Sequence, residues 1–334
     1  MSRAGAVRVC NSTARLLLSL ALLPGLLQAE GMALDSAKQA FARGDYNKAI
    51  EILKSAMGSD PNNGDLYALL SRSYLQLDQY DAAVSAGEKA VALSPNNSEI
   101  HRVLGEAYGA KADHASMLSA YSFARKTQKE FEAAVQLDPH NFEAMQNLIE
   151  YDCAAPGMVG GGEDKAQPLI QKLMSTDAAE GHYATGNCRE QKKDYAVADA
   201  EFAKALESKP KTPKRIYDIG DYFLKRKNAA QLLTVADAGE QLAPQDPRGK
   251  FYRATAFILQ GQKLPDAEQL LREYLQTAPM NSDYPRPWTA HYWLGQLEER
   301  RNNASSARAE YETALKLNGK YKPAQDALKQ LGSR

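Results

Sequence analysis

The chain has 334 residues, of which 44% are hydrophobic and 25% are charged, and its 41 basic residues balance its 41 acidic residues. A neutral chain with no basic stripe lacks the electrostatic footprint of a nucleic-acid-binding protein, so we expect no nucleic acid among its partners.

Residues 1–29 differ from the rest of the chain. They begin with scattered arginines, continue with the apolar run LLLSLALLPGLL at 16–27, and end on the small residue Ala29. This pattern predicts a cleaved secretory signal peptide, because a membrane span needs about 20 apolar residues. Cleavage would leave 38 basic and 41 acidic residues, and no other stretch that could span a membrane. We predict export to the periplasm; secretion, or anchoring by an uncleaved segment, is the alternative.

From about residue 30 to the end, a pattern recurs roughly every 34 residues. Its cleanest copy, 64–97, reads GDLYALLSRSYLQLDQYDAAVSAGEKAVALSPNN. Small residues recur at positions 8, 20 and 27 of the copies, and we expect positions 8 and 20 to face each other where two helices cross. Proline at position 32 cannot continue a helix and ends the second helix. It occupies six of the eight copies, as Pro61, Pro95, Pro139, Pro210, Pro244 and Pro279.

This spacing resembles the tetratricopeptide repeat, a helix–turn–helix module whose copies stack to bury a continuous core. The resemblance implies an all-α fold, a right-handed α-solenoid of about eight units closed by a capping helix at 322–331. The predicted units are 30–63, 64–97, 98–141, 142–178, 179–212, 213–246, 247–281 and 288–321.

Three segments depart from the repeat. In the third unit, a second helix capped by Asp113 is predicted to begin about three turns early, and we expect the extension to pack over a neighbouring unit; a partner-binding prong is the alternative. In the fourth unit, residues 155–166 read APGMVGGGEDKA. This loop lacks the Lys-Ser/Thr of a phosphate-binding loop, and it resembles a loop in exported bacterial tetratricopeptide proteins. The third departure, 281–288 (NSDYPRPW), is predicted to be an extended linker.

Cys153 and Cys188 lie 35 residues apart, close to one repeat, on first helices of neighbouring units. Such helices run side by side, so an oxidising compartment would permit a disulfide. The alternative is two unpaired cysteines packed as small apolar residues.

Nothing in the sequence predicts catalysis or a cofactor. The five histidines lie in different units without an i, i+4 pair, so no metal site is expected. The repeats occupy nearly the whole chain after residue 30 and leave no segment for a catalytic domain. We therefore expect a non-enzymatic protein without a cofactor.

A binding groove is predicted on the concave side, which first helices line in this architecture. Aromatic residues at position 5 and hydrogen-bonding residues at position 9 would hold an extended peptide or a short helix. The alternative is that the aromatic side chains are packing residues. The candidate residues are Tyr183, Asn187, Tyr217, Asp221, Phe251, Tyr292 and Gln296.

Three functional hypotheses follow. The first is an exported scaffold or adaptor that binds a protein or peptide partner in its groove. The second is a small-ligand-binding accessory component of an envelope transport system, with a cavity near 113–123 and 156–162. The third is a spacer or self-assembly module, and the sequence leaves the oligomeric state open.

Overall fold

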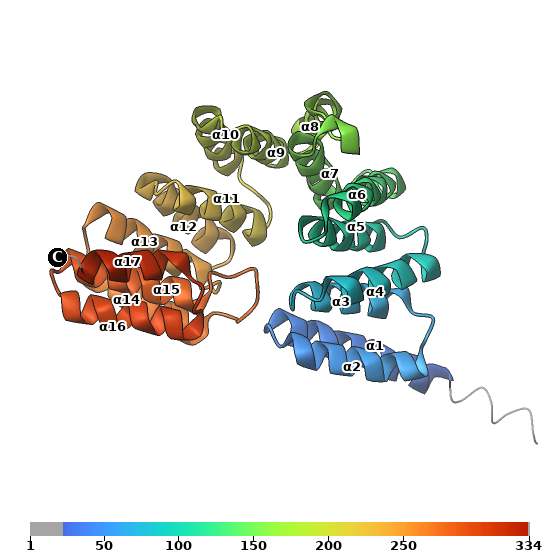
Figure 1. Ribbon diagram of the computed structural model, residues 1–334, viewed down its shortest axis with the longest axis horizontal. Coiled ribbons are helices and arrows are strands. Elements are labelled where there is room, and N and C mark those ends of the chain that lie inside the picture. Colours follow the sequence, from blue (N-terminus) through green and yellow to red (C-terminus); the bar gives the residue numbers. More distant parts are fainter. Residues whose placement is uncertain (1–22, 333–334) are drawn as a thin grey trace, which may run out of the picture.

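The computed structural model describes residues 23–332, and their side chains from residue 32 on. Within these residues it contains 17 α-helices, one short 3-10 helix and no strand, which confirms the all-α prediction (Figure 1). The first helices of the pairs are α1 (Leu23–Ala42), α3 (Gly64–Leu75), α5 (Ser98–Asp113), α7 (Phe142–Ala154), α9 (Ala178–Gln191), α11 (Pro213–Lys225), α13 (Arg248–Gln260) and α15 (Pro287–Arg300). The second helices are α2 (Tyr46–Ser59), α4 (Tyr80–Leu93), α6 (Met117–Leu137), α8 (Glu163–Thr176), α10 (Tyr195–Glu207), α12 (Ala229–Leu242), α14 (Leu264–Thr277) and α16 (Ala304–Leu317).

The predicted capping helix is confirmed as α17 (Lys322–Gly332). Its buried face carries Ala324 and Ala327, which join a core cluster with Tyr311 and Ala314 of α16. The last helical pair therefore does not end on an open apolar surface.

The signal peptide was predicted at residues 1–29. Residues 1–22 of it lie outside the described residues, and residues 23–29 form the start of α1. None of the helices within 23–332 is both long and apolar enough to cross a membrane.

Short polar segments separate the helices. Asn63 and Asn97, which follow repeat prolines, accept hydrogen bonds from backbone N–H groups in the first turns of α3 and α5. Asn141 does the same for α7. These side chains satisfy N–H groups that have no partner within the helix.

Glycines at repeat position 8 let the two helices of a pair approach closely. A Cβ atom on Gly105 would lie 2.4 Å from the Phe131 ring, and one on Gly295 would lie 2.3 Å from the Tyr311 ring. Position 8 was expected to face position 20, but the nearest atoms to these Cβ positions belong to aromatic rings at position 24 of the repeat, Phe131 and Tyr311. The second helix turns its aromatic side chain at position 24 onto this glycine, because the ring needs the space that a missing Cβ leaves.

The extension of α6 differs from its prediction. It has 21 residues, compared with 14 in α4, so it is about two turns longer rather than three. Its N-cap is Ser116, while Asp113 ends α5. Met117 and Leu118 are 88% and 87% exposed, so the first turn covers no neighbouring unit. The extension is matched by the long α5 of the same pair, since Phe123 stacks on Tyr108 at 6.1 Å.

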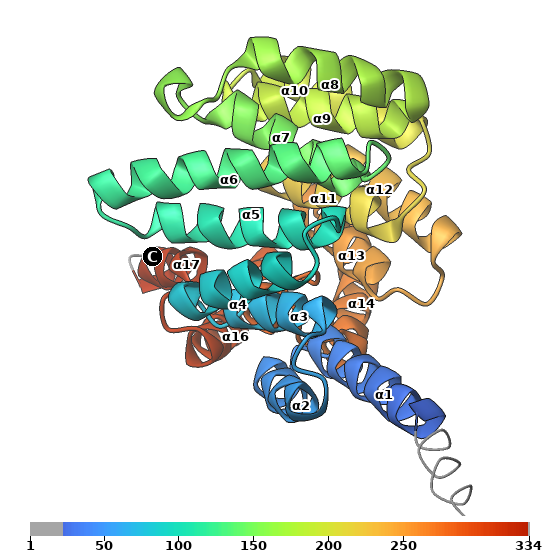
Figure 2. The same ribbon diagram turned by 90° about the vertical axis from the view of Figure 1, so that its right-hand side faces the viewer.

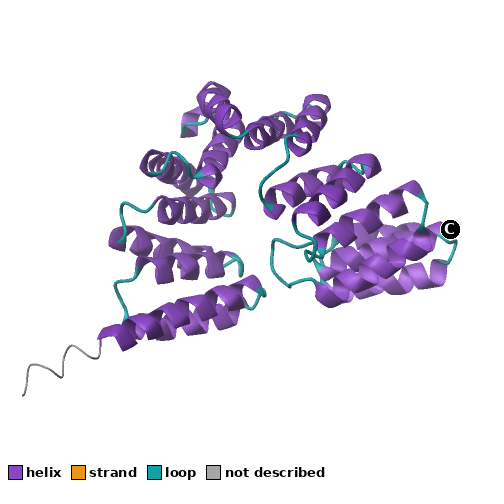
Figure 3. Cartoon of the chain, turned by 180° about the vertical axis from the view of Figure 1, so that it is seen from behind, coloured by secondary structure: helices purple, strands orange, loops and turns teal. Residues whose placement is uncertain are grey.

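The helical pairs follow one another in an arc (Figures 1 and 2). Helices α3, α5, α7, α9 and α11 lie toward the inner side of this arc, and their partners lie toward the outside. The arc curves so far that the turn between α1 and α2 faces the loop between α14 and α15 (Figure 3).

Candidate functional site

A polar groove of about 420 Å³ lies on the inner side of the arc, between side chains of α7, α9 and α11. We call it the inner groove. Of the predicted partner-binding residues, Tyr183, Asn187 and Asp221 come together here. Its charged lining residues are Glu150, Glu190, Asp218, Asp221, Lys193 and Lys225.

The other predicted aromatic residues do not line a groove. Tyr217 is 2% exposed and Phe251 is fully buried, so assigning them to the concave surface was wrong. Tyr217 stacks on Tyr252 at 5.5 Å, and Phe251 packs on Tyr274 at 5.2 Å. These rings turn into the interface between helical pairs, where apolar contacts stabilise the solenoid.

Tyr292 and Gln296 lie far along the arc, near the C-terminal cap. The half-buried Tyr292 ring packs against Tyr311 and Tyr321. Gln296 donates hydrogen bonds to Glu299 and to the Tyr311 hydroxyl. Neither residue belongs to the inner groove, and both make packing contacts within their own end of the molecule.

Several arginines of the first helices are already paired with carboxylates of the same chain. Sequence analysis missed these pairs, because some partners lie one repeat away: Arg215 and Glu180, for example, are 35 residues apart. Arg215 is almost fully buried, and its guanidinium also lies over the Tyr183 ring, 3.8 Å from its centre. The pairs are Arg102 with Glu99 and Glu106, Arg215 with Glu180 and Asp218, and Arg248 with Asp246.

The carboxylates of the inner groove are less well neutralised. Lys225 approaches Glu190 at 3.7 Å, but within the described residues no ion pair reaches Glu150 or Asp221. Desolvation in the groove raises the pKa of the Glu150 carboxyl, and the charge of Glu190 raises it further. Desolvation also raises the pKa of Asp221, against the effect of a hydrogen bond from Tyr252. The groove therefore offers unpaired negative charge to a cationic group.

A second cavity, of about 440 Å³, lies between α5, α6, α7 and the loop that follows α7. Its lining is mainly apolar and includes Ala112, Phe131, Tyr151 and Val159. It coincides in part with the ranges 113–123 and 156–162, through Asp113, Pro156 and Val159.

The glycine-rich loop forms one wall of this second cavity. It contains a short 3-10 helix, η1 (Gly157–Val159), and Gly160 adopts a φ of 103°, which favours glycine. The Gln128 side chain of α6 and the Lys165 side chain both donate hydrogen bonds to the Gly160 carbonyl. The extended α6 thus holds the loop, although its first turn is exposed.

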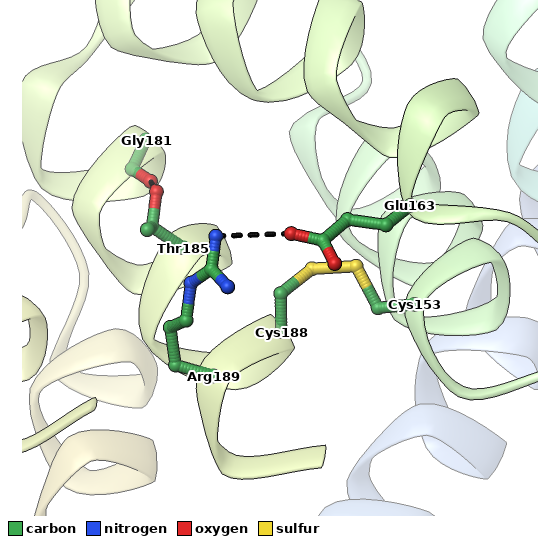
Figure 4. Close-up of a disulfide and its surroundings, with 6 residues drawn as sticks. All are labelled: Cys153, Glu163, Gly181, Thr185, Cys188 and Arg189. Atoms are coloured by element: carbon green, nitrogen blue, oxygen red, sulfur yellow. Dashed lines mark hydrogen bonds and ion pairs between the residues drawn. A yellow bond between two sulfur atoms is a disulfide. The ribbon is translucent and has the colours of Figure 1, made fainter. Parts of the chain in front are cut away.

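The two cysteines of the described residues are joined in the structure. Cys153 of α7 and Cys188 of α9 form a disulfide with their Cα atoms 5.3 Å apart (Figure 4). Both side chains are buried. Beside the disulfide, Arg189 forms an ion pair with Glu163 at 2.9 Å, so the start of α8 is tied to the same place.

Three of the histidines make the same kind of contact. Each hydrogen-bonds through Nδ1 to a glutamate on the second helix of its own pair: His101 to Glu130, His182 to Glu201 and His291 to Glu310. No group of three or more His, Cys, Asp or Glu side chains within the described part of the chain is arranged to hold a metal ion.

Comparison with known proteins agrees with the helical pairs. Two models of the tetratricopeptide repeat match the chain, one over residues 40–107 and the other over residues 280–323. No curated protein sequence matches it.

Several solved structures are similar to this chain. A thermophilic tetratricopeptide repeat protein from Thermus thermophilus is 22% identical, with 58% of this chain and 99% of that chain covered and a TM-score of 0.48. A tetratricopeptide repeat protein from Parabacteroides merdae is 12% identical, covers 91% of this chain and 99% of its own length, and has a TM-score of 0.42.

Both matched segments consist of the helical pairs described above, and neither model describes a catalytic domain. The recurring glycine–aromatic contacts and the terminal cap are what a stack of such pairs requires. The chain is a helical repeat protein that contains tetratricopeptide repeats.

Proposed function

We propose that the chain is a non-enzymatic scaffold that binds a protein or peptide segment in the inner groove, and that this segment carries Lys or Arg side chains. Tetratricopeptide repeats generally mediate protein–protein binding, and the matched family models support that class of function. The observation that carries the proposal is the pair of carboxylates, Glu150 and Asp221, that face the groove without an ion pair. Half-buried Tyr183 and Asn187 beside them supply apolar area and hydrogen bonds.

The test is the affinity for fluorescent peptides of equal length that carry either Lys and Arg or Asp and Glu. The basic peptides should bind, and their affinity should fall as salt rises. Glu150→Gln with Asp221→Asn should weaken their binding by about 5- to 10-fold, the range expected for two exposed charge contacts. The control, Glu207→Gln with Glu312→Gln, removes the same charge from outer helices and should bind normally. Equal binding by both double variants would refute the groove as the site.

The apolar second cavity supports another candidate function, the binding of a small apolar ligand as an accessory component of a transport system. The fluorescent probe N-phenyl-1-naphthylamine should bind there, and Ala124→Phe, which fills the space beside Phe131, should abolish the signal. Probe binding that survives this substitution would contradict the assignment.

Export to the periplasm remains part of the proposal. It is supported by the charge and hydropathy pattern of residues 1–29, and a disulfide is compatible with an oxidising compartment. N-terminal sequencing of the protein from its native cell should find a chain that begins near residue 30. A chain that retains Met1 would contradict cleavage.

A further inference from the structure

The two ends of the arc touch each other. The turn between α1 and α2, residues 43–45, contacts the loop between α14 and α15, residues 278–286 (Figures 1 and 3). The Asn281 side-chain amide donates a hydrogen bond to the Ala42 carbonyl, 239 residues away. The Ser282 N–H donates to the Tyr46 hydroxyl oxygen at 3.1 Å. We call the loop and the turn together the clasp.

The N-terminal side of the clasp is shaped for this contact. Gly44 adopts a φ of 81°, and a Cβ atom on it would lie only 2.1 Å from the Met280 carbonyl oxygen. The Tyr46 hydroxyl oxygen accepts the Ser282 hydrogen bond, and the Tyr46 ring makes an edge-on contact with Phe41 at 5.2 Å. The backbone of the loop therefore comes as close to the turn as a glycine allows.

The C-terminal side is held in place by its own helical pairs. Arg248 donates a hydrogen bond to the Asp283 carbonyl at 3.1 Å, and the Tyr274 hydroxyl donates to the Pro285 carbonyl at 2.5 Å. The Asn281 side chain is 6% exposed, and its Oδ1 accepts the Asp283 N–H at 2.9 Å. The loop thus presents Asn281 in a fixed position.

The closed arc brings the loop to the inner surface. Asp283 lines a cavity of about 420 Å³ together with Arg72 of α3, Glu106 of α5, Asn147 of α7 and Lys214 of α11. α3, α5 and α7 adjoin one another in the stack, whereas Lys214 and Asp283 reach the same space because the arc curves round. The clasp therefore bounds the concave side of the scaffold.

We propose that the clasp is a reversible gate that holds the solenoid as a closed ring and limits access to its concave side. Within residues 32–332, two hydrogen bonds join the ends, whereas many buried side chains join consecutive helical pairs. The clasp can therefore open by a small change in curvature without unfolding a repeat. A partner segment that belongs to a folded protein enters the inner groove when the clasp is open. This gating rests on the proposed function, whereas the contact between the two ends does not.

Distance measurement between the two ends tests the closure. Nitroxide labels at Lys48→Cys and Ser305→Cys, with Cys10→Ser and the native disulfide intact, report on the separation of α2 and α16. The wild-type clasp should give one narrow distance distribution. Tyr46→Phe with Asn281→Ala removes both hydrogen bonds and should add a longer population. The matched control, Tyr67→Phe with Asn96→Ala, should leave the distribution narrow.

A broad wild-type distance distribution, or one that the clasp variant leaves unchanged at equal helical content, would overturn the clasp.

The gating is tested with the basic peptide fused to a folded carrier protein. Its association rate should rise several-fold in the clasp variant, because a larger fraction of the molecules is open. Equal rates would overturn the gating. Failure of the peptide to bind either protein would overturn the proposed function and the gating with it, while the distances still decide on the clasp.

Discussion

At the residue scale, single glycines set how closely the helices pack. Gly105 and Gly109 lie one turn apart in α5, but only Gly105 faces an aromatic ring at less than contact distance. A Cβ on Gly109 would find its nearest neighbour, Thr127, at an ordinary 3.6 Å. Replacing either glycine by alanine changes helix propensity equally, but only the replacement of Gly105 disturbs packing.

We predict that Gly105→Ala destabilises the protein by about 1–3 kcal/mol, because the Phe131 ring must shift to admit the new methyl group. Gly109→Ala should be neutral or stabilise by up to about 1 kcal/mol, since alanine favours a helix. Chemical denaturation of both variants measures the difference. Equal stabilities would show that the close contact with Phe131 does not constrain position 8.

The buried carboxyl of Asp152 gives the stability a pH dependence. Asp152 is 3% exposed, and its Oδ1 makes no hydrogen bond within the described residues. Desolvation raises its pKa to about 6, although Lys165 acts in the opposite direction. Because this value lies above that of an aspartate in the unfolded chain, the unfolded state releases the proton more readily, and the fold loses stability as pH rises through this range.

Asp152→Asn should therefore unfold at a higher temperature than the wild type at pH 7.5, with a gain of at most about 3 kcal/mol. The gain should shrink as pH falls below 6 and approach zero below about pH 3, where Asp152 is protonated in both states. Asp35→Asn, at an exposed position in α1, serves as the control. A gain that is independent of pH would contradict an ionisation effect.

Residue-scale prediction from the sequence succeeded only in part. Of the residues predicted at positions 5 and 9, Tyr183, Asn187 and Asp221 meet in the inner groove. Tyr217 and Phe251 occupy the same repeat position as Tyr183 but turn inward. Gly239 of α12 leaves space for the Tyr217 hydroxyl, since a Cβ there would lie 2.3 Å away. Whether a ring at position 5 lines the groove or is buried depends on the side chains of the neighbouring helix, which its position in the repeat does not describe.

At the element scale, the disulfide joins two first helices across the irregular fourth unit. α8 begins only after the glycine-rich loop, so the contact between α7 and α9 stabilises a place where the repeat is interrupted. Reduction should lower the thermal unfolding temperature, corresponding to about 2–4 kcal/mol for a bridge that closes a loop of this length. Cys153→Ala with Cys188→Ala should be insensitive to reductant. If reductant also left the unfolding temperature of the wild-type protein unchanged, the disulfide would have no stabilising role.

Helices were the most predictable elements, because proline, asparagine and small residues recur at one spacing. Irregular elements were less predictable. The extended α6 is capped by Ser116 rather than by Asp113, since α5 continues to Asp113. The linker predicted at 281–288 is only partly correct, since the loop spans 278–286 and Pro287 begins α15. Its contact with the first helical pair depends on the curvature summed over the whole arc.

At the scale of the whole molecule, the repeat determines both the shape and the kind of function. Within the described residues, stacked pairs produce an inner surface on which Arg102, Arg215 and Arg248 are paired, while Glu150 and Asp221 have no ion pair. That difference in charge is the reason to expect a basic partner segment. The same curvature brings the α1–α2 turn and the α14–α15 loop into contact in the clasp. The shape of the arc therefore controls access to the inner groove.

The central claim is that the inner groove receives the partner. A photo-crosslinking amino acid in place of Asn187 should form a covalent adduct with the partner in the native cell. The same amino acid in place of Ala200, which is exposed on the outer helix α10, should form none. Replacing Glu150 and Asp221 by their amides should reduce the adduct at position 187. Adducts that form equally at both positions, or only at position 200, would contradict binding in the inner groove.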